Sequence, residues 1–156
     1  MKLSEHFTLE EMIASSEAPR RGIDNSPTPD VIEELRKTAE LLEEVRAILG
    51  GQVVIVTSGY RCPALNAAIG GAANSAHMWG GAADFLCPSA GSPMIVCQKL
   101  AGTPGLRFDQ IIHEFGSWTH IGRARDGSCR QQVLTIDGSG TRFGLLAPAP
   151  PAATAG

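Results

Sequence analysis

The chain has 156 residues, of which 43% are hydrophobic and 19% are charged. This length and balance are typical of one globular domain and exclude an intrinsically disordered chain. Thirteen basic and sixteen acidic residues give a net charge of −3, so the basic surface that nucleic acid requires is not expected. No apolar run is long enough to span a bilayer. We therefore expect neither nucleic acid nor a membrane as a partner.

The first third of the chain is predicted to be mainly helical. Thr8 opens a capping box and predicts a short helix, whereas residues 18–28 contain prolines and a glycine and predict a loop. Thr28 and Pro29 mark the start of a longer helix that ends at Gly50, because apolar residues recur at helical spacing between them. We expect this longer helix to belong to the core.

The rest of the chain is predicted to mix short strands with short helices. Strands are expected where apolar residues run together or alternate, at residues 53–56, 82–86, 109–115, 118–122 and 133–136. Helices are expected over residues 63–69 and 92–100, with a loop of small residues over 72–81. Because no strand–helix–strand alternation is visible, the sequence predicts an α+β fold. The Ala/Pro-rich residues 147–156 are predicted to be a disordered tail.

The four cysteines and the N-terminus predict where the chain is made. The cysteines form no CxxC pairs, so a metal site of cysteines alone is not expected. The first residues lack the apolar segment of a secretory signal peptide. We therefore expect synthesis in the cytoplasm, with the cysteines as free thiols.

Two histidines and one aspartate are the residues that indicate a chemical function. Asp84 lies between Ala83 and Phe85 in a short apolar stretch, and a buried carboxylate needs a partner such as a metal or an arginine. His77 lies in the preceding loop and His120 in a half-buried strand pattern. Each residue alone fits an ordinary loop or core position. Together, two imidazoles and one carboxylate make a three-ligand zinc site with one position open for water.

Short motifs surround these three residues, namely Ser58-Gly59-Tyr60-Arg61, Ser75-x-His77 with the later Asp84, and Trp118-x-His120. Together they resemble the M15 family of zinc peptidoglycan peptidases. The resemblance runs from the N-terminus to about Gly122, and the opening residues resemble the phage and prophage members. The family shares its fold with hedgehog signalling domains. This implies a single α+β domain over residues 1–146, in which a small, mostly antiparallel sheet packs with helices.

The resemblance also implies a role for each motif residue. Arg61 would hold a carboxylate or carbonyl of the substrate, since its forked guanidinium suits that contact. Ser75 would hydrogen-bond the substrate backbone, and Trp118 would form a wall of the cleft. The zinc ligands would be His77, Asp84 and His120.

Two residues are candidates for the general base. Ser117 occupies the position, three residues before the last histidine, where many M15 enzymes have an acid, and it cannot serve. The hedgehog-like pattern instead places a glutamate six residues before that histidine, and Glu114 matches it. A three-residue turn would put Glu114 on the same face as His120, whereas a two-residue turn would put His113 there. We predict Glu114, with His113 as the alternative.

The predicted function is zinc-dependent hydrolysis of peptidoglycan stem peptides, by a D-Ala-D-Ala carboxypeptidase or an L-Ala-D-Glu endopeptidase. The phage-like opening and the missing signal peptide favour a monomeric endolysin that is made in the cytoplasm and acts on the cell wall after release. One alternative is a non-catalytic, zinc-stabilised module on the same fold that binds cell wall or protein. A metal-free domain with buried histidines is the third.

Overall fold

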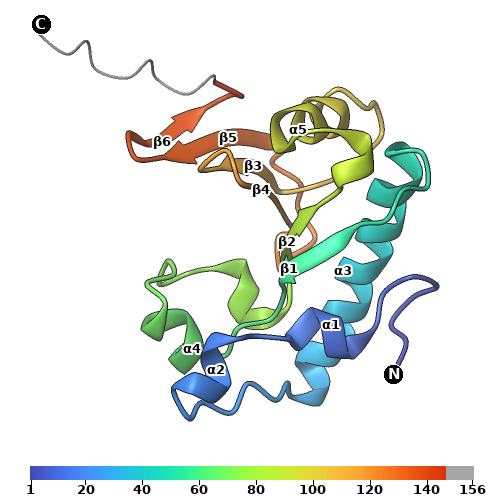
Figure 1. Ribbon diagram of the computed structural model, residues 1–156. Coiled ribbons are helices and arrows are strands. Elements are labelled where there is room, and N and C mark those ends of the chain that lie inside the picture. The colour runs from blue at the N-terminus through green and yellow to red at the C-terminus, as the bar shows by residue number, and fades with distance from the viewer. Residues whose placement is uncertain (147–156) are drawn as a thin grey trace, which may run out of the picture.

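A six-stranded sheet forms the centre of the computed structural model, which describes residues 1–146 (Figure 1). Its strands are β1 (Ile55–Ser58), β2 (Ala82–Leu86), β3 (Gln110–Glu114), β4 (Trp118–Gly122), β5 (Gln132–Asp137) and β6 (Gly140–Phe143). They lie in the order β1-β2-β4-β3-β5-β6. Four of the five pairings are antiparallel, and only β3 and β5 run parallel. The prediction of an α+β fold with a mostly antiparallel sheet is confirmed.

Helices pack against the sheet and form most of the N-terminal part of the chain. They are α1 (Leu9–Ile13), α2 (Glu17–Arg20), α3 (Pro29–Ile48), α4 (Pro63–Ala68) and α5 (Pro93–Ala101), with 3₁₀ turns η1 (Ala76–Trp79) and η2 (Pro88–Ala90). The predicted caps are present, because the hydroxyls of Thr8 and Thr28 accept hydrogen bonds from the amides of Glu11 and Val31. Within residues 1–146, no helix has the length and hydropathy needed to cross a membrane.

The structure corrects several predicted boundaries. The strand predicted at residues 53–56 begins at Ile55, because β2 ends at its partner Leu86 and leaves the two preceding valines without a strand to pair with. Helix α2 occupies the start of the loop predicted over residues 18–28, and η1 lies within the predicted 72–81 loop. Strand β6 was not predicted, since it is short and mostly exposed. The predicted tail, residues 147–156, lies outside the described residues.

The two faces of the sheet carry different side chains. Phe85, Ile111 and Ile121 belong to the hydrophobic core together with residues of α3 and α5. Because side chains alternate across a strand, the neighbours Asp84 and His120 project from the opposite face. Packing of the hydrophobic side chains on one face of the sheet therefore fixes where Asp84 and His120 lie on the other face.

An ion pair fastens the connection between β4 and β5 to the sheet. Asp109, just before β3, is almost completely buried. Its Oδ1 accepts hydrogen bonds from the amide and Nε of Arg130, and its Oδ2 accepts one from Nη2 at 2.7 Å. These bonds hold the pKa of Asp109 below its ordinary value, since they stabilise the charged form.

We expect Asp109→Asn to lower the free energy of unfolding at neutral pH by about 1–2 kcal/mol, a modest loss because the Arg130 guanidinium is largely exposed. The folded-state pKa lies below the unfolded value, so this stability is present above the unfolded pKa and is lost as the pH falls through the folded pKa. Urea unfolding of both proteins should therefore show a difference at pH 7 that shrinks as the pH falls below the ordinary aspartate value of about 4. A difference that does not change with pH would contradict this account.

Candidate metal centre

The 3₁₀ turn η1 places His77 in the interior of the protein. Ser75 caps the turn, since its Oγ accepts a hydrogen bond from the His77 amide at 3.2 Å, and Gly80 ends it with a φ of +85°. The imidazole is only 2% exposed, and burial lowers the pKa of His77. Its Nδ1 lies 2.6 Å from the carbonyl oxygen of Gly59. A carbonyl oxygen can only accept, so Nδ1 carries the proton and Nε2 is left with a free lone pair.

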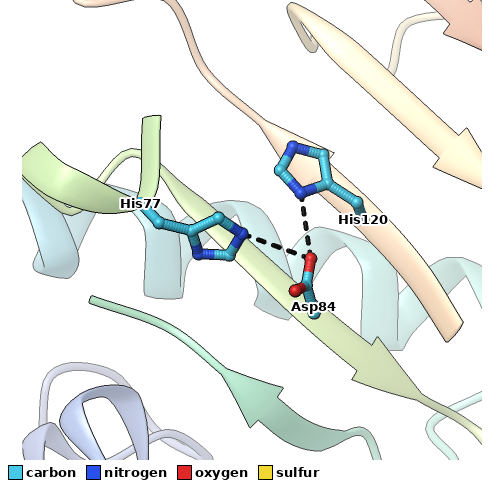
Figure 2. A group of neighbouring side chains, drawn as sticks. All are labelled: His77, Asp84 and His120. Atoms are coloured by element: carbon cyan, nitrogen blue, oxygen red, sulfur yellow. Dashed lines mark hydrogen bonds and ion pairs between the residues drawn. The ribbon is translucent and has the colours of Figure 1, made fainter. Parts of the chain in front are cut away.

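Asp84 and His120 lie directly opposite each other on β2 and β4. The Oδ1 of Asp84 is 2.9 Å from Nδ1 of His120 and 3.3 Å from Nε2 of His77 (Figure 2). Burial alone would raise the pKa of Asp84, but the two imidazoles hold it well below its usual range. The carboxylate is therefore charged and faces two imidazole rings.

These three side chains fit a bound cation. One potential ligand atom from each residue lies within 4.8 Å of the other two, and all three residues are buried. The lone pair of His77 Nε2 faces a carboxylate oxygen at 3.3 Å, which is an unfavourable meeting of two acceptors. A metal ion between them would accept both lone pairs, and two imidazoles with one carboxylate are a donor set of catalytic zinc sites. The group can therefore hold a metal ion.

The turn between β3 and β4 places Glu114 beside this group. The turn has three residues, 115–117, and Glu114 pairs with Trp118, so its side chain lies on the same face as His120. Its Oε1 is 3.8 Å from Nδ1 of His120. Burial and the charge of Asp84 raise the pKa of Glu114. Of the two sequence candidates for the base, Glu114 is the one on the face of the metal-binding group.

His113, the other candidate, projects from the opposite face of β3. It pairs with Thr119, which lies between the two site residues of β4. It is 5% exposed, and its Nδ1 has no hydrogen-bond partner within residues 1–146. Burial lowers the pKa of His113. The ring is therefore an uncharged part of the interior, away from the face that carries Asp84 and His120.

Arg61 and Ser75 lie beside η1, and Trp118 lies on the same sheet face as His120. An Nη2 of Arg61 lies 3.4 Å from Oγ of Ser75, and the Arg61 amide donates to the carbonyl of His77. Burial lowers the pKa of Arg61, while the charges of Asp84 and Glu114 act in the opposite direction. The side-chain Nε of Arg61 and Nε1 of Trp118 are buried donors without an acceptor within residues 1–146. Both side chains thus keep an unused donor near the site.

We did not identify from the sequence the residues that contact η1 and its end from α3 and from the segment after β4. The hydroxyl of Thr38, in α3, donates to the carbonyl of Gly80 at 2.7 Å. Arg123 donates to both Glu34 and Thr38, and its guanidinium lies 5.6 Å from the ring centroid of Trp79. A signal for Thr38 was present, because it is a polar residue at an apolar position of the long helix. For Arg123 no sequence signal was available.

The chain matches the model of a known protein family. The model of the family described as Peptidase M15 matches residues 5–122, which include all the candidate site residues discussed above as ligands, base or substrate contacts. Strands β5 and β6 lie beyond the match. No curated protein matches the chain.

Proposed function

Because the chain belongs to the M15 family of peptidases, we propose that it is a zinc-dependent peptidase that hydrolyses the stem peptides of bacterial peptidoglycan. The observation that carries this proposal is the buried group of His77, Asp84 and His120, whose donor atoms fit zinc. The family membership supports the reaction class, and the buried group supports this location for the reaction.

His77, Asp84 and His120 would hold zinc at a fixed position. Zinc bound there supplies a Lewis acid that polarises a carbonyl group and makes water a usable nucleophile near neutral pH. The Gly59 carbonyl fixes the tautomer of His77 so that Nε2 points to Asp84. The strand pairing of β2 and β4 fixes the other two ligands relative to each other.

Glu114 would act as the general base and acid. Its carboxylate would take a proton from the attacking water and deliver it to the leaving amine. The raised pKa supports this role, because a base whose pKa is closer to the working pH also returns the proton more readily as an acid. Its Oε1 lies 3.8 Å from Nδ1 of His120, one of the proposed ligands.

Arg61, Ser75 and Trp118 would bind the substrate. The guanidinium of Arg61 suits a carboxylate, and stem peptides carry one at the terminal D-Ala and another on D-Glu. The unused donors on Arg61 and Trp118 support this assignment, since a substrate oxygen would supply the missing acceptor. The opening residues, which resemble phage members of the family, support an endolysin that is made in the cytoplasm and acts on the wall after release. We further propose that it works as a monomer.

Mass spectrometry of purified peptidoglycan tests the proposed function directly. We expect the zinc-loaded protein to release fragments, and we expect a chelator to stop the release and added zinc to restore it. The fragment masses identify the bond, between L-Ala and D-Glu or between the two D-Ala residues. An intact wall after incubation with protein that contains bound zinc would contradict the proposal and favour a non-catalytic binding module.

A further inference from the structure

The β3–β4 turn has an unusual residue at a strained position. Phe115 and Gly116 both have positive φ, +52° and +64°, and the Ser117 amide donates to the carbonyl of Glu114 across them. Consecutive positive φ values in such a turn favour Asn-Gly or Asp-Gly. An aromatic residue is disfavoured there, since its Cβ crowds the backbone. Folding of the turn therefore gives no reason for a phenylalanine.

The side chain of Phe115 also lies at an unfavourable place for an apolar group. It is 54% exposed, whereas most large apolar residues of the described chain are buried. Its amide donates to the carbonyl of Ile136 at 2.7 Å, which fastens the turn to β5. The ring is thus held by its backbone in an exposed position instead of being drawn into the core.

The exposed ring adjoins the candidate site through Trp118. The two ring centroids are 5.8 Å apart, with an angle of 42° between the planes. Trp118 lies opposite Glu114 on the face that carries His120. Phe115 therefore adds an exposed aromatic ring next to Trp118, on the turn that leads into the strand carrying His120.

We propose that Phe115 is a specificity-determining residue that packs against an aliphatic C–H face of the substrate at the β3–β4 edge of the site. This inference rests on the proposed function. A half-exposed aromatic ring beside an indole offers a rigid, flat, apolar surface, which loses little conformational entropy on binding. The peptidoglycan substrate has two such faces, the muramoyl sugar ring and the alanine methyl groups. The strain and the exposure at Phe115 are then costs of substrate recognition.

The test removes the ring without harming the turn. Asparagine suits the left-handed conformation, so Phe115→Asn should fold at least as stably as the parent, and Phe115→Tyr should keep the ring surface. The parent protein for both Phe115 variants carries Glu114→Gln, so that bound substrate is not hydrolysed during the measurement. Calorimetry measures the dissociation constants of a stem peptide with and without the muramoyl sugar, and the melting temperature and zinc content are recorded for each variant.

We expect Phe115→Asn to weaken binding about three- to tenfold at unchanged zinc content, and Phe115→Tyr to restore it. A matched control is Ile95→Ala on α5, which truncates another exposed apolar side chain, 43% exposed, and should leave the dissociation constants unchanged. Weakening for both ligands assigns the contact to alanine methyl groups, and weakening only for the muramoyl peptide assigns it to the sugar.

Two results would overturn the inference about Phe115. One is an unchanged dissociation constant for Phe115→Asn with both ligands, and the other is no binding of either ligand to the parent. Failure of the proposed function is detected separately: the protein with Glu114 intact would bind the peptide but would not cleave it. In that case a weakened Phe115→Asn variant would still support the contact.

Discussion

His77→Ala should lose bound zinc and peptidase activity together, and its melting temperature should no longer respond to a chelator. The change removes one of three ligands and leaves the buried carboxylate of Asp84 with one imidazole. A metal that binds only the folded state stabilises it by about 4 kcal/mol at a thousandfold excess over its dissociation constant, and this contribution is lost with the site. His120→Ala should behave in the same way.

Metal analysis of the purified variants, together with thermal unfolding with and without chelator, measures these effects. His113→Ala is the matched control, because His113 is also a buried histidine of the sheet but projects from the opposite face. That variant should be less stable than the wild type, yet it should retain one equivalent of zinc and a melting temperature that the chelator lowers. Full zinc content in both His77→Ala and His120→Ala would show that the metal lies elsewhere.

Local sequence signals predicted the elements that are determined locally. The long helix was predicted from its capping threonine and first-turn proline, and these features begin α3 in the structure. The start of β1 depends instead on where its partner β2 ends, which no local pattern records. Strand β6 pairs with β5 along its whole length, and three of its four residues are exposed. Such elements follow from tertiary pairing and escape a sequence pattern.

That His77, Asp84 and His120 come together was predictable, because residue types alone mark them as possible metal ligands. His77, Asp84 and His120 come from a 3₁₀ turn and two strands, yet each was identified from a short motif. The choice between Glu114 and His113 could not be settled from the sequence, since a turn one residue shorter reverses which side chains face the site. Turn length is set by the pairing of β3 with β4, and only the structure shows it.

The supports behind the site were beyond sequence reasoning for a different reason. The hydrogen bond from His77 to Gly59 joins a side chain to a backbone carbonyl, and any residue type supplies a carbonyl. The contact of Arg123 with Glu34 spans most of the domain in sequence. Nothing in the local sequence around an arginine or a helix glutamate indicates that the two form such a contact. The residues that orient ligands are therefore harder to find than the ligands themselves.

Glu114→Gln should lower kcat by about 10²- to 10⁴-fold while the protein keeps its zinc and its fold. Glutamine has nearly the same shape as glutamate and cannot take a proton from water. The metal-binding group is untouched, since its ligand atoms come from three other residues. Steady-state kinetics on a soluble stem peptide, together with zinc content and thermal unfolding, measures the separation of turnover from metal binding. His113→Gln is the matched control and should retain turnover, because that side chain faces away from the site.

The stability of the same variant distinguishes a catalytic carboxylate from a structural one. Burial and the nearby charge of Asp84 raise the pKa of Glu114, so its charged form is less favourable in the folded protein than in the unfolded chain. Replacing it with neutral glutamine should therefore leave the metal-free protein equally or more stable at neutral pH. A catalytic group retained at a cost to stability shows this pattern. A marked loss of stability with unchanged kcat would instead mean that Glu114 holds the fold together and that the base lies elsewhere.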